Sequence, residues 1–103
     1  MKEDIERKDA ALRQALDLVG DRWTALIMWQ LRDGPKRFTD LQGLCGINTK
    51  TLSQRLITIE EAGMITKEVI NEFPPRTMYS MTDRGAALLP AFNTMMEWVR
   101  KYY

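Results

Sequence analysis

The side chains best suited to chemistry in this sequence lie in the stretch TKTLSQRL, residues 49–56. Four of them carry the ammonium, hydroxyl or carboxamide groups that hydrogen-bond to the edges of DNA bases: Lys50, Thr51, Ser53 and Gln54. Three arginines are candidates for holding DNA phosphates: Arg37, Arg55 and Arg76. Long polar side chains also cover most exposed helices, so a solvated helix face is the alternative interpretation.

Apolar residues in the same stretch recur with the period of a helix. Leu52, Leu56 and Ile59 are spaced i, i+4 and i+7, which places them on one face at about 100° per residue. Asn48 is a suitable N-cap residue because its side chain can accept a backbone hydrogen bond. The sequence predicts a helix over about 49–62, with this face inward and the first two turns polar and outward.

A shorter helix is predicted just before it. Phe38, Leu41 and Leu44 are spaced i, i+3 and i+6, and Gly46 interrupts the pattern. Two short helices joined by a tight, glycine-containing turn are typical of a helix-turn-helix, whose second helix enters the major groove of DNA. We expect this motif over about 36–63.

The distribution of charge favours double-stranded DNA as a partner more than the net charge does. The net charge is only +1, which by itself argues against a phosphate-rich partner. Between residues 36 and 58, however, four basic residues stand against Asp40 alone. The positive charge is therefore concentrated on the predicted motif.

Composition argues against an enzyme and against a membrane protein. The chain has no histidine and one cysteine, and no Gly-rich phosphate loop or paired-carboxylate motif, so we expect no catalysis, no metal and no cofactor. Its 103 residues predict a single domain over 1–103. No apolar run approaches the ~18 residues that span a membrane, and the charged N-terminus lacks a secretory core, so we expect a cytoplasmic protein.

Two helices are predicted before the motif. Leu12 and Leu16 belong to an apolar pattern that predicts a first helix over about 4–19. Asp21 can cap a second helix over about 22–33, which has apolar residues around most of its circumference. Such a helix is either central or faces a partner.

A β-hairpin is predicted over about 64–82, directly after the motif. This segment is rich in β-branched and aromatic residues and contains the sequence FPPR, residues 73–76, in its middle. Proline restricts the backbone and cannot donate to a ladder, so these residues predict a long, stiff tip. The fold class is therefore mainly α with a small β-hairpin (α+β), a winged helix-turn-helix. Arg76 would contact a phosphate or the minor groove, or else be solvated or paired within the chain.

The last helix is predicted over about 83–101, kinked by Pro90. It has more apolar residues than one face needs, which indicates a partner helix, most simply that of a second copy. Two alternatives follow from this surplus. One is a winged-helix module that binds proteins instead of DNA. The other is a regulator with a pocket for a small hydrophobic effector between the dimer helices, lined by Trp23, Trp29, Phe92 and Met96.

Three segments together resemble the HxlR-type family of bacterial transcription regulators. They are LDLVGDRWTALIMWQLRDGPKRFTDL, GINTKTLSQRLITIEEAGMI and PPRTMYSMTDRGAALLP, the last followed by a tryptophan, and the resemblance covers about 15–101. It implies a MarR-like winged-helix homodimer that binds an inverted-repeat operator, with the first and last helices forming the interface.

Individual positions carry the family's expected roles. The resemblance implies that Arg37 and Phe38 open the helix-turn-helix, with Arg37 on the DNA backbone. Residues matched to the recognition helix are Lys50, Leu52, Ser53, Gln54, Arg55 and Leu56. Residues matched to the wing and the turn after it are Pro74, Pro75, Arg76, Tyr79, Thr82 and Gly85.

The sequence departs from the family at its cysteine. Many members that sense oxidants have a cysteine before the first helix, where this chain has Glu6 to Ala11. Thiol sensing in that manner is therefore not expected. Cys45 lies at the turn of the helix-turn-helix, where an inert packed thiol is favoured over a sensor.

Overall fold

The computed structural model describes residues 1–103 as six helices and a small sheet. The helices are α1 (Lys2–Val19), α2 (Thr24–Gln30), α3 (Phe38–Cys45), α4 (Thr49–Glu61), α5 (Asp83–Ala86) and α6 (Leu89–Tyr102). The strands are β1 (Lys36–Arg37), β2 (Ile65–Ile70) and β3 (Arg76–Met81), in the antiparallel order β1-β3-β2. The predicted winged helix-turn-helix is confirmed, with one addition. The two-residue strand β1, too short to leave a pattern in the sequence, completes the sheet.

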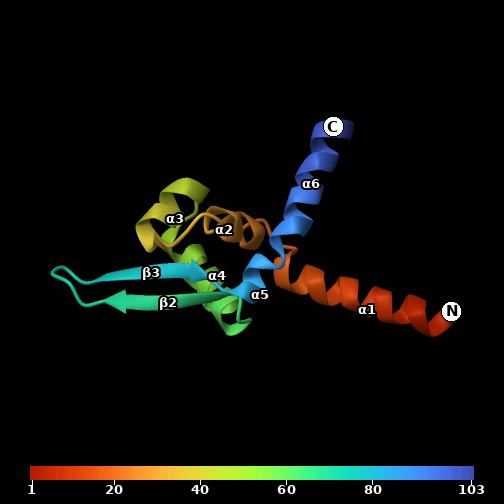
Figure 1. Ribbon diagram of the computed structural model, residues 1–103, viewed down its shortest axis with the longest axis horizontal. Coiled ribbons are helices and arrows are strands. Elements are labelled where there is room, and N and C mark those ends of the chain that lie inside the picture. Colours follow the sequence, from red (N-terminus) through yellow and green to blue (C-terminus); the bar gives the residue numbers. More distant parts are fainter.

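The molecule is elongated because two elements project from its body in opposite directions (Figure 1). The β2–β3 hairpin extends to one side, and α1 extends to the other, along a longest dimension of 59 Å. Helix α6 leaves the body at a steep angle to α1 (Figure 1). None of the residues of α1 is buried.

The core lies where α2, α3 and α4 meet the base of the hairpin. Leu52, Leu56 and Ile59 are at most 2% exposed, as the helical spacing predicts. They pack in one cluster with buried residues from the other elements, namely Ile27, Met28, Leu31, Leu41, Ile47, Met64, Ile65, Tyr79 and Phe92. Burying apolar side chains is the main force that holds α4 to the body.

The prediction of a single kinked helix over 83–101 is wrong. The chain forms the short helix α5, turns at Ala87–Leu88 and starts again as α6, with Pro90 in its first turn. Proline is tolerated there because the N–H groups of a first helical turn have no partner within the helix. The second helix is also shorter than the predicted 22–33, spanning Thr24–Gln30.

Gly85 in α5 packs closely against the backbone of Met64, which belongs to the core. A Cβ atom built on it would lie 2.2 Å from the carbonyl oxygen of Met64 and 2.9 Å from Cγ of Met81. By contrast, a Cβ atom on Gly43 in α3 would meet nothing within 4 Å. The same substitution, glycine to alanine, can therefore be compared at a crowded position and at an open one.

We expect Gly85→Ala to lower the free energy of unfolding by about 2 kcal/mol or more, because backbone and packed side chains must shift. Gly43→Ala should raise it by up to about 1 kcal/mol, because alanine is the better helix former. Urea denaturation followed by circular dichroism measures both. Equal effects of the two substitutions would contradict this packing.

Candidate nucleic-acid interface

The start of α4 is fixed by two side-chain hydrogen bonds. Oδ1 of Asn48 accepts from the backbone N–H of Thr51 at 2.9 Å, which confirms the predicted N-cap. Nε2 of Gln42, on α3, donates to Oγ1 of Thr49 at 2.8 Å. Gly46 ends α3 in the left-handed conformation, with φ of 66°. The angle between the two helices is thus held from both sides of the turn. The role of Gln42 could not be predicted from the sequence because its partner is seven residues away.

The four candidate base readers are not equally accessible. Lys50 and Gln54 are exposed and stand one helical turn apart, whereas Thr51 and Ser53 are half-buried on the flanks. Ile57 lies on the same outward face and is 56% exposed. An exposed apolar residue beside base-reading groups can contact a thymine methyl group. Its position on the predicted helix, on the same side as Lys50 and Gln54, is the sequence signal that could have revealed this role.

Arg55 does not face outward with them. Its Nη1 atom lies 4.0 Å from Oδ1 of Asp21, and its side chain is 36% exposed. Asp21 also accepts hydrogen bonds from the N–H groups of Trp23 and Thr24 and from the hydroxyl of Thr24, so it caps the turn that leads into α2. The N-cap residue of α2 itself is Trp23, which has no side-chain cap, so the predicted cap lies two residues ahead of it. Arg55 therefore lies beside the junction of α1 and α2, where its charge attracts Asp21 only weakly at this separation, in addition to any contact with phosphate.

The acidity of Asp21 reflects these contacts. Burial acts to raise the pKa of this carboxyl group, but the hydrogen bonds from Thr24 and Trp23, with the charge of Arg55, outweigh it and lower the pKa below its ordinary value. The carboxylate is thus the stable form at the α1–α2 junction, as an ion-pair partner of the reading helix must be.

Arg37 stands free at the N-terminus of α3. Its backbone N–H donates to Oδ2 of Asp40 at 3.1 Å, which caps the helix. The residue is exposed, and its guanidinium group forms no ion pair or hydrogen bond within the chain. Neighbouring Lys36 differs, because its Nζ atom lies 3.0 Å from Oδ1 of Asp33. Arg37 can therefore reach a phosphate without giving up a partner.

The wing carries two cations in different situations. Arg76 begins β3, and its Nη2 atom lies 3.3 Å from Oε1 of Glu72. Lys67, on β2, lines a groove of about 140 Å³ between α4 and the sheet, together with Ser53, Leu56, Ile57, Glu60 and Tyr79. Lys67 is exposed and has no ion-pair partner within 4 Å. Lys67 could not be predicted from the sequence because only the folded hairpin brings it beside α4.

Cys45 is the last residue of α3, one position before the turn. It is half-buried, and burial raises the pKa of its thiol. A redox-reactive cysteine needs the opposite shift, because the thiolate is the nucleophile. The local environment therefore agrees with a packed thiol.

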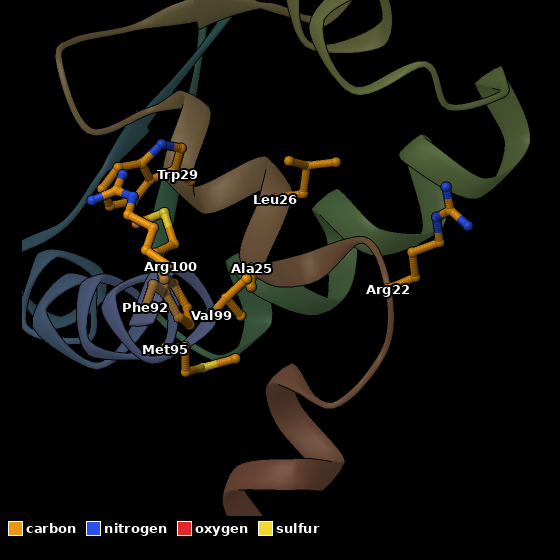
Figure 2. A pocket seen from close by; sticks show the side chains of 9 residues that line it. Arg22, Ala25, Leu26, Trp29, Phe92, Met95, Val99 and Arg100 are labelled. Carbon is orange, nitrogen blue, oxygen red and sulfur yellow. The ribbon is translucent and has the colours of Figure 1, made fainter. Parts of the chain in front are cut away.

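A second hollow lies away from these residues, between α2 and α6 (Figure 2). Its volume is about 580 Å³, and seven of its nine lining residues are hydrophobic. The structure brings three of the four expected pocket residues together there: Trp29, Phe92 and Met96. Trp23 is not among them. Its half-buried ring packs against the core, with the guanidinium group of Arg22 5.1 Å from its centre.

No helix of this structure is both long and apolar enough to cross a membrane.

Comparison with known proteins links this geometry to gene regulation. A model of the HxlR-like helix-turn-helix family matches residues 18–103. The uncharacterised HTH-type transcriptional regulator YvaP of Bacillus subtilis is 37% identical over 90 residues, which cover 86% of this chain and 83% of YvaP. The HTH-type transcriptional regulator YodB of the same species is 34% identical over 92 residues, covering 88% and 82%.

Solved structures agree with this relationship. A MarR-family transcriptional regulator from Porphyromonas gingivalis superposes with a TM-score of 0.84 and 28% identity, over 89% of this chain and 91% of that one. The quinone-bound form of B. subtilis YodB superposes with a TM-score of 0.78 and 31% identity, over 89% and 97%. These similar proteins are transcription regulators, not enzymes.

Proposed function

Because this chain belongs to the HxlR-like helix-turn-helix family of transcription regulators, we propose that it binds an inverted-repeat operator in double-stranded DNA as a homodimer in the cytoplasm. One observation carries the proposal. The first turns of α4 present Lys50 and Gln54 outward, while the buried side chains on the opposite face hold the helix to the body. This is the arrangement in which a recognition helix reads the major groove.

The exposed groups divide into two roles. Lys50 and Gln54 read base edges, with Thr51 and Ser53 at the flanks of the contact. Arg37 and the wing residue Arg76 hold phosphates, which bind any sequence. Arg55 acts mainly by positioning α4 through Asp21, and reaches a phosphate only at the edge of the interface.

Homodimerisation explains two helices that the single chain leaves uncovered. Helix α1 has 18 residues and buries none of them, although helices in proteins owe most of their stability to the packing of an amphipathic face. Along one side it exposes Ile5, Leu12 and Leu16 by 56% or more. On α6, Met95, Trp98, Val99 and Tyr102 are also exposed. Two copies related by a two-fold axis would cover these surfaces and present two α4 helices to an inverted repeat.

The proposed roles predict different effects on DNA binding. Gln54→Ala should reduce discrimination between operator and random DNA by roughly 1–3 kcal/mol, because a base contact is lost. Arg37→Ala should weaken binding to all sequences alike and flatten the slope of log affinity against log salt by about one. Fluorescence anisotropy at several salt concentrations measures both. If both substitutions only lowered affinity uniformly, the division of roles would be wrong.

Substitutions in α1 test the proposed homodimer. Leu12→Glu should convert the dimer to a monomer and weaken operator binding at least tenfold, because a charge enters the apolar contact and one reading head is lost. Gln14→Glu serves as the control, because it adds the same charge on the opposite side of the helix. Analytical ultracentrifugation of both variants is the measurement. A Leu12→Glu variant that remains dimeric and binds normally would place the interface elsewhere.

The hollow between α2 and α6 supports a second role, binding of a small hydrophobic effector. Its lining is apolar apart from Arg22 and Arg100. Figure 2 shows that Arg22 points away from the cluster of Phe92, Met95 and Val99. Because α6 would also contact the partner subunit, a ligand that favours one arrangement of the two heads would shift operator affinity by that preference.

Trp29 in this lining gives the proposed effector site a spectroscopic signal. Small aromatic molecules that bind should change the tryptophan fluorescence of the dimer, and the change should be much smaller in Trp29→Phe. Trp23→Phe, outside the hollow, serves as the control. Absence of any Trp29-dependent change over a broad panel would exclude this site.

A further inference from the structure

We propose that Glu72 restrains Arg76 and thereby limits the sequence-independent affinity of the wing for DNA. This inference rests on the proposed DNA-binding function. Glu72 lies two residues beyond the end of β2, and Arg76 is the first residue of β3. Their side chains meet across the tip of the hairpin, with Nη2 and Oε1 3.3 Å apart. The two prolines between them restrict the backbone and keep the two residues at a short separation.

The charge of the hairpin makes this pair important. Residues 65–81 contain two basic residues, Lys67 and Arg76, and two acidic ones, Glu68 and Glu72. Arg76 is the only cation next to the tip, the part of the wing farthest from the body (Figure 1). A carboxylate and a phosphate offer the same kind of oxygen acceptor to a guanidinium group. Glu72 therefore occupies the group that a phosphate would bind.

The paired conformation does not satisfy Arg76 fully. Its Nε atom is buried and has no hydrogen-bond partner, which is unfavourable for a donor. The side chains of Arg76 and Glu72 are 35% and 54% exposed, and ion pairs this exposed are weak. If the guanidinium group turned outward, a phosphate could accept hydrogen bonds from Nε and Nη2 together. The structure thus favours an exchange of partners, from carboxylate to phosphate, when the wing meets the DNA backbone.

Such an exchange has a consequence for specificity. Without Glu72, Arg76 would bind every phosphate backbone more tightly, and operator and random DNA would gain alike. With Glu72, each wing contact must first replace an internal ion pair. Selection among sequences is then left to Lys50 and Gln54 on α4, and less protein is held on non-operator DNA.

The test uses the protein of residues 1–103 and two matched substitutions. Glu72→Gln removes the charge and keeps the shape of the side chain. We expect affinity for random-sequence duplex to rise about threefold, the size of one exposed ion pair, and the salt slope to steepen by up to about one. Glu68→Gln removes the same charge from the same hairpin, but Glu68 forms no ion pair. It should change affinity much less.

A double-mutant cycle shows whether Glu72 acts through Arg76. The gain from Glu72→Gln should disappear when Arg76 is already glutamine, because no guanidinium group remains to be released. A gain that persists in the Arg76→Gln background, or that equals the gain from Glu68→Gln, would overturn the inference and leave general charge repulsion as the cause. Salt-dependent DNA binding by the wild-type protein would still support the proposed function. Its absence in the wild type would refute both.

Discussion

The burial of one face of α4 is the constraint on which the rest of this structure depends. Leu52, Leu56 and Ile59 enter a core shared by α2, α3 and the base of the hairpin, which leaves Lys50 and Gln54 no direction but outward. Rotating the helix would expose apolar surface, at about 25 cal/mol for each Å². The side chains proposed to meet DNA are therefore determined by buried groups that would not touch it.

Several polar contacts add to the core in fixing the position of α4. Asn48 and the Gln42–Thr49 hydrogen bond fix where α4 starts, and Asp21 with Arg55 ties its side to the start of α2. Asp21 lies two residues after the end of α1, so this contact joins the reading helix to the segment between α1 and α2. The wing is set apart from this network. It is formed by β2 and β3, and its tip has its own ion pair between Arg76 and Glu72, so the proposed contact of Arg76 with DNA could change without moving the reading helix.

The sequence predicted the elements whose signals are local. A spacing of i, i+4 and i+7, an N-cap at Asn48 and a proline-containing tip between two β-rich segments each carry their own physical reason, and the structure contains all three. The sequence predicted the structure less well where one residue is compatible with two local structures. A proline can kink a helix or stand in the first turn of a new one. The chain turns at Ala87–Leu88, so Pro90 stands in the first turn of α6.

Long-range partners could not be read from the sequence at all. Arg55 has the same side chain as Arg37, but only the fold places Asp21 beside it. Lys67 becomes a candidate for DNA contact only because β2 lies next to α4. Trp23 does not line the expected pocket because it packs against the core. In each case the residue type indicated what the side chain can do, and the tertiary contacts determined where it can do it.

In the proposed dimer, the outward faces of the two α4 helices read an inverted repeat while basic groups hold the phosphates. This arrangement can be tested by binding the purified protein to a pool of random-sequence duplexes at two salt concentrations and sequencing the retained DNA. We expect enrichment of an inverted repeat and a steep loss of binding as salt rises. A folded dimer that enriches no sequence, and whose DNA binding does not depend on salt, would contradict it and favour a winged-helix module that binds proteins.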